Sequence, residues 1–189
     1  MVKPDHWIRQ MSLDHGMIEP CAEGKSREGK ISYGLSSYGY DMRICNEFKV
    51  FDKTGIVDPK NLPSEAYREV ETDVLEMPPG SAVLARSVEY FRIPRGILTI
   101  TFGKSTYARC GVLVNVTPFE PEWEGFVTIS IINANAHPAL LYAGEGIAQV
   151  LFLGGDGDCE RSYADKKGKY QAQRDITTAR IDGSGGDSR

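Results

Sequence analysis

Apolar and polar positions alternate along much of the chain, and this pattern predicts many short strands. The strand candidates are residues 48–51, 81–91, 97–102, 112–117, 126–132, 139–142 and 147–153. Successive side chains of a strand point to opposite faces, so such alternation is typical of sheets with one buried face. The glycine-containing turn at 143–146 predicts that the last two candidates pair as a hairpin.

One amphipathic helix is predicted at residues 4–15. Trp7, Ile8 and Met11 would share one face of this helix, and Gly16 can end it. Residues 52–80 are instead rich in proline, charge and turn residues, which predicts loops with one helical turn near residues 64–67.

The spacing of these elements favours a mainly β fold. Many short strands and one N-terminal helix are typical of a β-sandwich or barrel. We find no internal repeat and no linker, so we predict one domain over residues 1–182. Residues 183–189 lack apolar side chains and are predicted to form a disordered tail.

Composition and charge limit the kinds of partner that the protein is expected to bind. The 189 residues carry a formal net charge of -4, which argues against a nucleic-acid backbone as partner. No apolar run approaches the ~20 residues that span a membrane, and the N-terminus shows no apolar signal segment. We therefore expect a cytoplasmic protein without a membrane partner. The four cysteines and three histidines are scattered without zinc-binding spacing, so no zinc site is expected.

The stretch 103–111 lies between two predicted strands and carries two cations, two hydroxyls and a glycine at each end. Ser105 or Thr106 can cap a short helix whose free N–H groups would face an anion. Lys104 supplies a point charge, and the guanidinium of Arg109 suits phosphate oxygens. The stretch therefore predicts a phosphate-binding turn; the alternative is a solvated turn with ordinary surface charges.

Several segments together resemble the dCTP deaminase family of the dUTPase superfamily. They are residues 36–41, 85–91, 103–109, 115–118, 120–125 and 142–149. The resemblance implies a dUTPase-like distorted β-barrel or jelly-roll subunit and a homotrimer with active sites between subunits. It also implies hydrolysis of dCTP to dUTP and ammonia without zinc, with Mg²⁺ accompanying the triphosphate.

The resemblance assigns roles to residues by their motif positions. Ser105 and Arg109 match an active-site serine and arginine, while Lys104 and Thr106 match phosphate-contacting neighbours. The remaining matches are Val116 and Pro118 at the pyrimidine edge, Glu122 and Trp123 near the deoxyribose, and Tyr163, Lys169 and Gln173 in a C-terminal segment that closes over the triphosphate.

One position departs from the family pattern. Ser130 stands where the deaminases carry a glutamate that shuttles protons between water, ring nitrogen and the leaving amine. The flanking Gly125 and Asn133 fix this alignment without a gap. General acid–base catalysis of this kind is worth about 10²–10⁴-fold, and a serine hydroxyl cannot serve as the base unaided.

Three functions follow from this departure. The first is a dCTP deaminase that uses a substitute base or a chain of water molecules. The second is a nucleoside triphosphate pyrophosphohydrolase of the same superfamily, with Glu122 or Asp41 recruited to position water. The third is a non-catalytic nucleotide-binding regulator. In each case the expected partner is a deoxynucleoside triphosphate.

Overall fold

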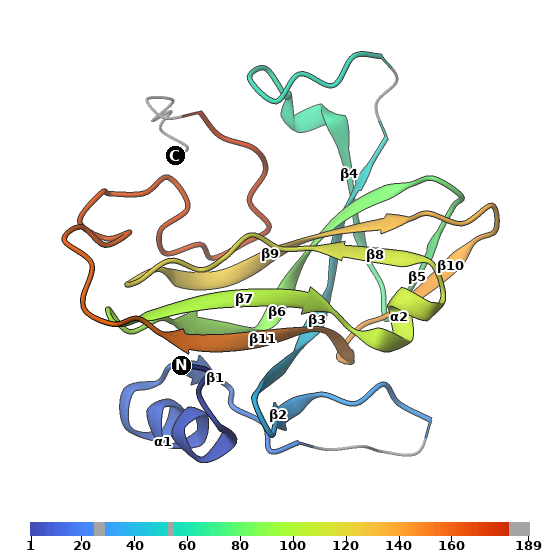
Figure 1. Cartoon of the computed structure of the whole chain (residues 1–189). Coiled ribbons are helices and arrows are strands. Elements are labelled where there is room, and N and C mark those ends of the chain that lie inside the picture. Colours follow the sequence, from blue (N-terminus) through green and yellow to red (C-terminus); the bar gives the residue numbers. More distant parts are fainter. Residues whose placement is uncertain (25–28, 53–54, 182–189) are drawn as a thin grey trace.

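The computed structural model describes residues 1–24, 29–52 and 55–181, and the predicted tail lies outside this part of the chain (Figure 1). The helical elements are α1 (Asp5–His15), a 3₁₀ turn η1 (Ser64–Ala66) and α2 (Ser105–Arg109). The strands are β1 (Ile18–Glu19), β2 (Gly34–Ser36), β3 (Gly39–Phe51), β4 (Tyr67–Glu71), β5 (Val74–Met77), β6 (Ala82–Arg92), β7 (Ile97–Gly103), β8 (Val112–Asn115), β9 (Glu124–Asn133), β10 (Ala139–Tyr142) and β11 (Gly146–Gly154).

The main sheet curls into a distorted barrel. Its strands follow the order β7-β11-β3-β6-β9-β8, and β1, β2 and β4 extend it as side branches. The two end strands, β7 and β8, are consecutive in the chain and also contact each other across the turn that contains α2 (Figure 1). Buried side chains such as Ile44, Phe91 and Phe152 fill the interior. The predicted β-barrel with one N-terminal helix is confirmed.

The N-terminal helix packs against β2 and β3 at the side of the barrel (Figure 1). Helix α1 buries Ile8, and Gly16 ends it in the left-handed conformation with φ 62°. This conformation is accessible to glycine at little cost, which explains why the helix stops there. Among the described residues, none of the helices is long and apolar enough to cross a membrane.

The predicted hairpin of residues 139–142 and 147–153 is wrong. Strand β10 pairs with β5, whereas β11 pairs with β3 and β7. The backbone of the connecting turn forms hydrogen bonds with distant segments: Ala143 N donates to Asp73 O, and Gly144 N donates to Ile44 O. These long-range bonds separate the two strands into different sheets.

The expectation of loops over residues 52–80 is only partly right. The helical turn appears as η1, but β4 and β5 also lie in this region. Both strands are short and carry charged residues on their exposed side, as Arg68 and Glu76 illustrate. Edge strands often carry such charges, and this composition resembles that of a loop.

A buried ion pair lies between β3 and β6. The carboxylate of Glu89 is fully buried and accepts hydrogen bonds from Arg43 Nε at 2.7 Å and Arg43 N at 2.9 Å. The hydroxyl of Tyr40 lies 3.2 Å from the same carboxylate. Burial raises the pKa of Glu89, and Arg43 opposes this change. Glu89 points inward because side chains alternate along β6, and it lies on the same buried face as Ala85, Ser87 and Phe91.

Candidate functional site

The predicted phosphate-binding turn forms the short helix α2 at the end of β7. The expectation that Ser105 or Thr106 caps this helix is wrong. Lys104 occupies the N-cap position, and no side chain of the described residues caps the helix there. The backbone of Lys104 is extended and donates to Ile147 O, so the helix begins one residue later. The hydroxyl side chains of Ser105 and Thr106 lie exposed in the first turn.

The two cations of this turn have different surroundings. Lys104 Nζ lies 2.5 Å from Asp41 Oδ2, and the two side chains are only 11% and 16% exposed. Arg109 is exposed, and its Nη1 donates to Ser105 O at 3.1 Å. Beneath them, Tyr107 anchors the helix, and burial raises its pKa to about 12. The turn therefore presents Arg109 to solvent and holds Lys104 against β3.

A groove of about 750 Å³ lies at the opposite end of β7. Its walls include most residues that the sequence assigns to the base, the sugar and the C-terminal segment: Val116, Pro118, Trp123, Tyr163, Lys169 and Gln173. Leu98 and Phe119 add apolar surface to it. An apolar groove with a few polar side chains is the usual form of a small-molecule site.

The C-terminal segment covers one side of this groove through hydrogen bonds to the loop before β9. The indole Nε1 of Trp123 donates to Tyr170 O at 2.7 Å, and Tyr170 N donates to the hydroxyl of Tyr163 at 3.0 Å. Phe126 N also donates to Gln173 O at 3.0 Å. These bonds bring Tyr163, Lys169 and Gln173 beside Trp123.

Ser130 lies in the middle of β9 and is half-buried. Its backbone partners are Asn115 on β8 and Leu84 on β6. Because side chains alternate along a strand, Ser130 shares a sheet face with Thr128, which lines the groove. The position predicted for the proton shuttle thus lies next to the groove, and its side chain carries a hydroxyl group in place of a carboxylate.

The carboxylates at the border of the groove are held in ion pairs. Glu120 lies 3.0 Å from Lys166 Nζ, and Glu122 lies 2.8 Å from Arg95 Nη1. An Arg or Lys partner forms a charge-assisted hydrogen bond with a carboxylate and keeps it turned toward the cation. Neither carboxylate is therefore well placed to take over the proton transfers that Ser130 cannot perform.

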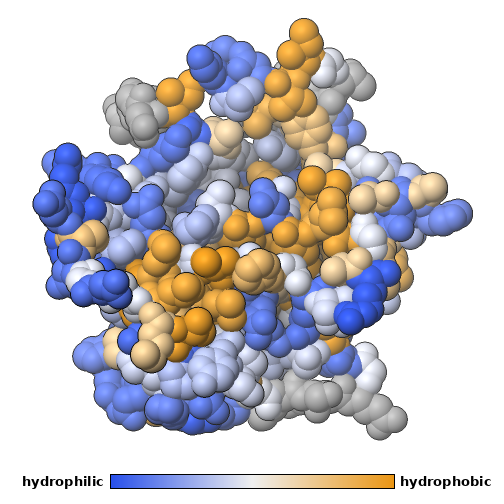
Figure 2. Space-filling model, in the orientation of Figure 1, coloured by the Kyte–Doolittle hydropathy of each residue, from blue (hydrophilic) through white to orange (hydrophobic). Residues whose placement is uncertain are grey.

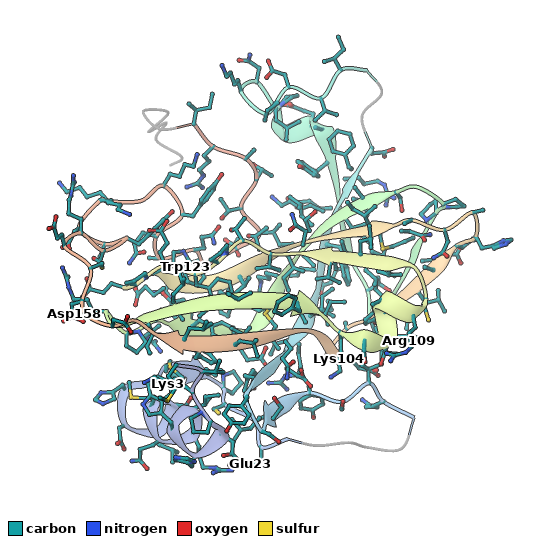
Figure 3. All side chains as sticks on the ribbon, viewed as in Figure 1. Lys3, Glu23, Lys104, Arg109, Trp123 and Asp158 are labelled. Atoms are coloured by element: carbon teal, nitrogen blue, oxygen red, sulfur yellow. The ribbon has the colours of Figure 1, made fainter. Side chains whose placement is uncertain are left out.

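The predicted site residues form two groups that lie apart in one chain. Figure 3 shows Lys104 and Arg109 at one end of the barrel and Trp123 at the other. Strand β7 connects these ends, and its seven residues span about 20 Å. A triphosphate cannot touch both groups of a single chain at once. The structure brings together the residues predicted for the base and for the covering segment, and leaves the predicted phosphate-binding turn separate.

The sequence patterns do not reveal the roles of some residues that shape the site. Arg95 and Asp165 form an ion pair at the base of the C-terminal segment, with 2.9 Å between Arg95 Nη2 and Asp165 Oδ2. The sequence suggests Asp41 as a possible carboxylate for water activation, whereas the structure pairs it with Lys104. These partners are 63 to 70 positions apart in sequence, and no spacing signal connects them.

By fold, the protein is similar to one solved deaminase structure. The crystal structure of 2'-deoxycytidine 5'-triphosphate deaminase from Agrobacterium tumefaciens matches 82% of this chain with a TM-score of 0.62 and 13% sequence identity. This chain spans 48% of the length of that one.

Sequence comparison identifies the family. The family model described as dCTP deaminase-like matches residues 2–155, and the chain belongs to this family. A protein named dCTP deaminase from Acidobacterium capsulatum is 59% identical over 182 residues, which are 95% of this chain and 99% of the relative. A dCTP deaminase from Granulibacter bethesdensis is 58% identical over the same shares of both chains.

Proposed function

We propose that this protein is a dCTP deaminase-like hydrolase that binds dCTP and converts it slowly to dUTP and ammonia. The observation that carries the proposal is the near full-length identity of 58–59% to proteins of that name. The groove beside Trp123 supports it, because its apolar walls and neutral polar side chains suit a pyrimidine nucleoside.

The proposed reaction replaces the exocyclic amine of the cytosine ring with oxygen from water. Water loses a proton as it attacks the carbon, and the ring nitrogen gains that proton. The new hydroxyl then gives its proton to the amine, which departs as ammonia and leaves a carbonyl. Ser105 and Arg109 would orient the reacting groups, and Ser130 would contribute only a hydrogen bond. Without a carboxylate at position 130, the proton transfers depend on water, so we expect the reaction to be slow.

The triphosphate would be held by the helix α2 turn and by the covering segment. Lys104, Thr106 and Arg109 would contact it from one side and Lys169 from the other. Among the described residues, no cluster of three or more His, Cys, Asp or Glu side chains is arranged to hold a metal. We propose that Mg²⁺ binds through the triphosphate oxygens and water, as it often does in nucleotide sites. The proposed reaction uses no zinc.

We also propose a homotrimer, because one chain cannot complete the site. The phosphate turn of one subunit would meet the groove of the next. An apolar surface supports this arrangement: Leu98, Ile100 and Phe102 on β7 and Leu113 on β8 are 37–56% exposed. Figure 2 shows apolar atoms gathered across the middle of this face. Exposed apolar patches of this kind often mark interfaces.

Phe102→Glu is expected to dissociate the trimer, because a charge would be buried at the proposed interface. Light scattering should give the mass of three chains for the wild type and a lower mass for the variant. Leu13→Glu is the matched control, since Leu13 is 74% exposed on α1 and lies away from β7. A monomeric wild type, or a Phe102→Glu variant with the mass of the wild type, would contradict the assembly.

Binding of dCTP is the direct test of the proposed function. Calorimetric titration should show saturable binding of dCTP with Mg²⁺ and weaker binding when the metal is chelated. Incubation with dCTP, followed by chromatography, should show ammonia and dUTP appearing at less than about 1 s⁻¹, the lower end of ordinary enzyme rates. The proposal fails if none of dCTP, dUTP and dTTP binds.

One observation favours a second candidate, a non-catalytic nucleotide-binding regulator. Position 130 holds serine, and the bordering carboxylates of Glu120 and Glu122 are paired with cations. The same incubation separates the candidates. Binding without ammonia or pyrophosphate release would identify a regulator, and pyrophosphate release would identify a pyrophosphohydrolase.

A further inference from the structure

Arg95 lies in the turn between β6 and β7 and joins three separate segments of the chain. Its Nη1 donates to Glu122 Oε2 at 2.8 Å, and its Nη2 donates to Asp165 Oδ2 at 2.9 Å. The same Nη2 lies 3.3 Å from Cys159 O and 3.4 Å from Glu160 O. A planar guanidinium can serve several acceptors at fixed angles, so one side chain here fastens the loop before β9 and the C-terminal segment to β6–β7.

The loop that Arg95 holds has a strained backbone. In the described part of the chain, the non-glycine residues with positive φ are Glu122 (62°), Lys167 (52°) and Ala172 (55°). All three belong to the loop or to the C-terminal segment. Side chains clash with the backbone in this conformation, so it persists only where surrounding contacts hold it. For Glu122 those contacts are the ion pair with Arg95 and the hydrogen bond from its N–H to Ile93 O.

The C-terminal segment is fastened through Asp165. Asp165 N donates to Ser162 Oγ at 3.1 Å, and Ser162 N donates back to Asp165 Oδ2 at 3.0 Å. These bonds and the Arg95 guanidinium hold the pKa of Asp165 below its ordinary value. The closed turn places Tyr163 beneath the backbone of Tyr170.

We propose that Arg95 is a positioning residue for nucleotide binding. It does not line the groove itself. It acts through Glu122 on the neighbouring Trp123, and through Asp165 on the segment that carries Tyr163 and Lys169. By joining the two, it sets the width of the groove before any ligand arrives. The effect on nucleotide affinity rests on the proposed function; the effect on the C-terminal segment does not.

The test compares Arg95→Ala and Arg95→Lys with the wild type in three measurements. Trypsin cleavage reports exposure of the C-terminal segment, which offers Lys166, Lys167 and Lys169. Fluorescence reports Trp123 in a Trp7→Phe background, since the chain has two tryptophans. Calorimetry reports the affinity for dCTP with Mg²⁺.

Arg95→Ala should speed cleavage of the segment and weaken dCTP binding by about tenfold or more, the change expected for loss of a charge-assisted hydrogen bond. The emission of Trp123 should shift to longer wavelength, because its indole loses the cover of Tyr170. Arg95→Lys keeps the positive charge but lacks the planar guanidinium. Its cleavage rate, emission wavelength and dCTP affinity should lie between those of the wild type and Arg95→Ala. Asp165→Asn should loosen the segment through the other end of the same pair.

Arg9→Ala is the matched control. Arg9 bonds Glu23 at 2.8 and 3.0 Å with a side-chain exposure of 40%, close to the 36% of Arg95, but it lies on α1. This variant should leave cleavage, fluorescence and affinity unchanged. The proposal is overturned if Arg95→Ala behaves like Arg9→Ala, or if it lowers only the melting temperature.

Failure of the proposed function would look different. If the wild type binds no nucleotide, that function fails, and cleavage and fluorescence still decide whether Arg95 joins the loop to the segment. If Arg95→Ala does not fold, Arg95→Lys and Asp165→Asn test whether Arg95 joins the loop to the C-terminal segment. Wild-type behaviour of both in all three measurements would then overturn the proposal.

Discussion

Ser130→Glu is expected to raise the rate of dCTP conversion to dUTP by about a hundredfold or more, the usual worth of one general acid–base group. A carboxylate at this position can take a proton from water and return it to the ring nitrogen. The hydroxyl of Ser130 cannot accept a proton at neutral pH. The gain should appear in the rate at saturating dCTP, because the groove and the phosphate turn are left unchanged.

The structure allows this substitution. Ser130 is half-buried, and its backbone hydrogen bonds to β6 and β8 do not depend on its side chain. A longer side chain there would extend on the same face as Thr128, which lines the groove. We therefore expect Ser130→Glu to fold and to bind dCTP.

Ser130→Gln is the control that separates charge from size. Glutamine has the length of glutamate without an ionisable group, so this variant should react no faster than the wild type. Ammonia and dUTP are quantified by chromatography, and dCTP affinity is measured for each protein. Equal rates for Ser130→Glu and Ser130→Gln, or a wild-type rate above about 1 s⁻¹, would show that another group performs the proton transfers.

Local patterns were sufficient to predict the strands that form the barrel wall. Strands β6 and β9 alternate buried and half-buried positions over most of their length, β7 alternates buried and exposed ones, and this alternation is visible in the sequence. Prediction failed where distant backbone groups decide the structure. The turn at Gly144 has the sequence of a hairpin turn. Its backbone is instead hydrogen-bonded to β3, and β10 pairs with β5 in a separate sheet.

The site shows the same division. The turn around Lys104 was recognisable because its charges and glycines are adjacent in sequence. The ion pairs of Lys104 with Asp41 and of Arg95 with Asp165 were not recognisable, because each joins residues that are far apart in the sequence. The separation of the phosphate turn from the groove also required the structure, since it depends on the direction of β7 (Figure 3).

Glu89→Ala is expected to lower the free energy of unfolding by about 3–5 kcal/mol, the usual cost of removing one partner of a buried ion pair. The substitution leaves the guanidinium of Arg43, whose side chain is 18% exposed, without its carboxylate. It also removes a hydrogen-bond partner from the hydroxyl of Tyr40 and one acceptor from the backbone N–H of Arg43. Urea denaturation at equal protein concentration measures the difference.

Glu69→Ala is the control for this experiment. Glu69 lies 3.3 Å from Lys49 Nζ, but its side chain is 79% exposed. Exposed pairs of this kind contribute up to about 1 kcal/mol, so the variant should remain close to the wild type. If Glu89→Ala is no less stable than Glu69→Ala, the buried pair does not hold β3 against β6.

The pH dependence of Glu89 provides an independent check through Glu89→Gln. Burial raises the pKa of Glu89 above its ordinary value of 4.5, so the folded protein holds this proton more tightly than the unfolded chain. The stabilising contribution of the proton is complete below pH 4.5 and is lost as the pH rises through the folded pKa. Glutamine carries no such proton, so Glu89→Gln should gain stability relative to the wild type as the pH rises. A stability difference that does not change with pH would show that the carboxyl of Glu89 has the same pKa in the folded and unfolded protein.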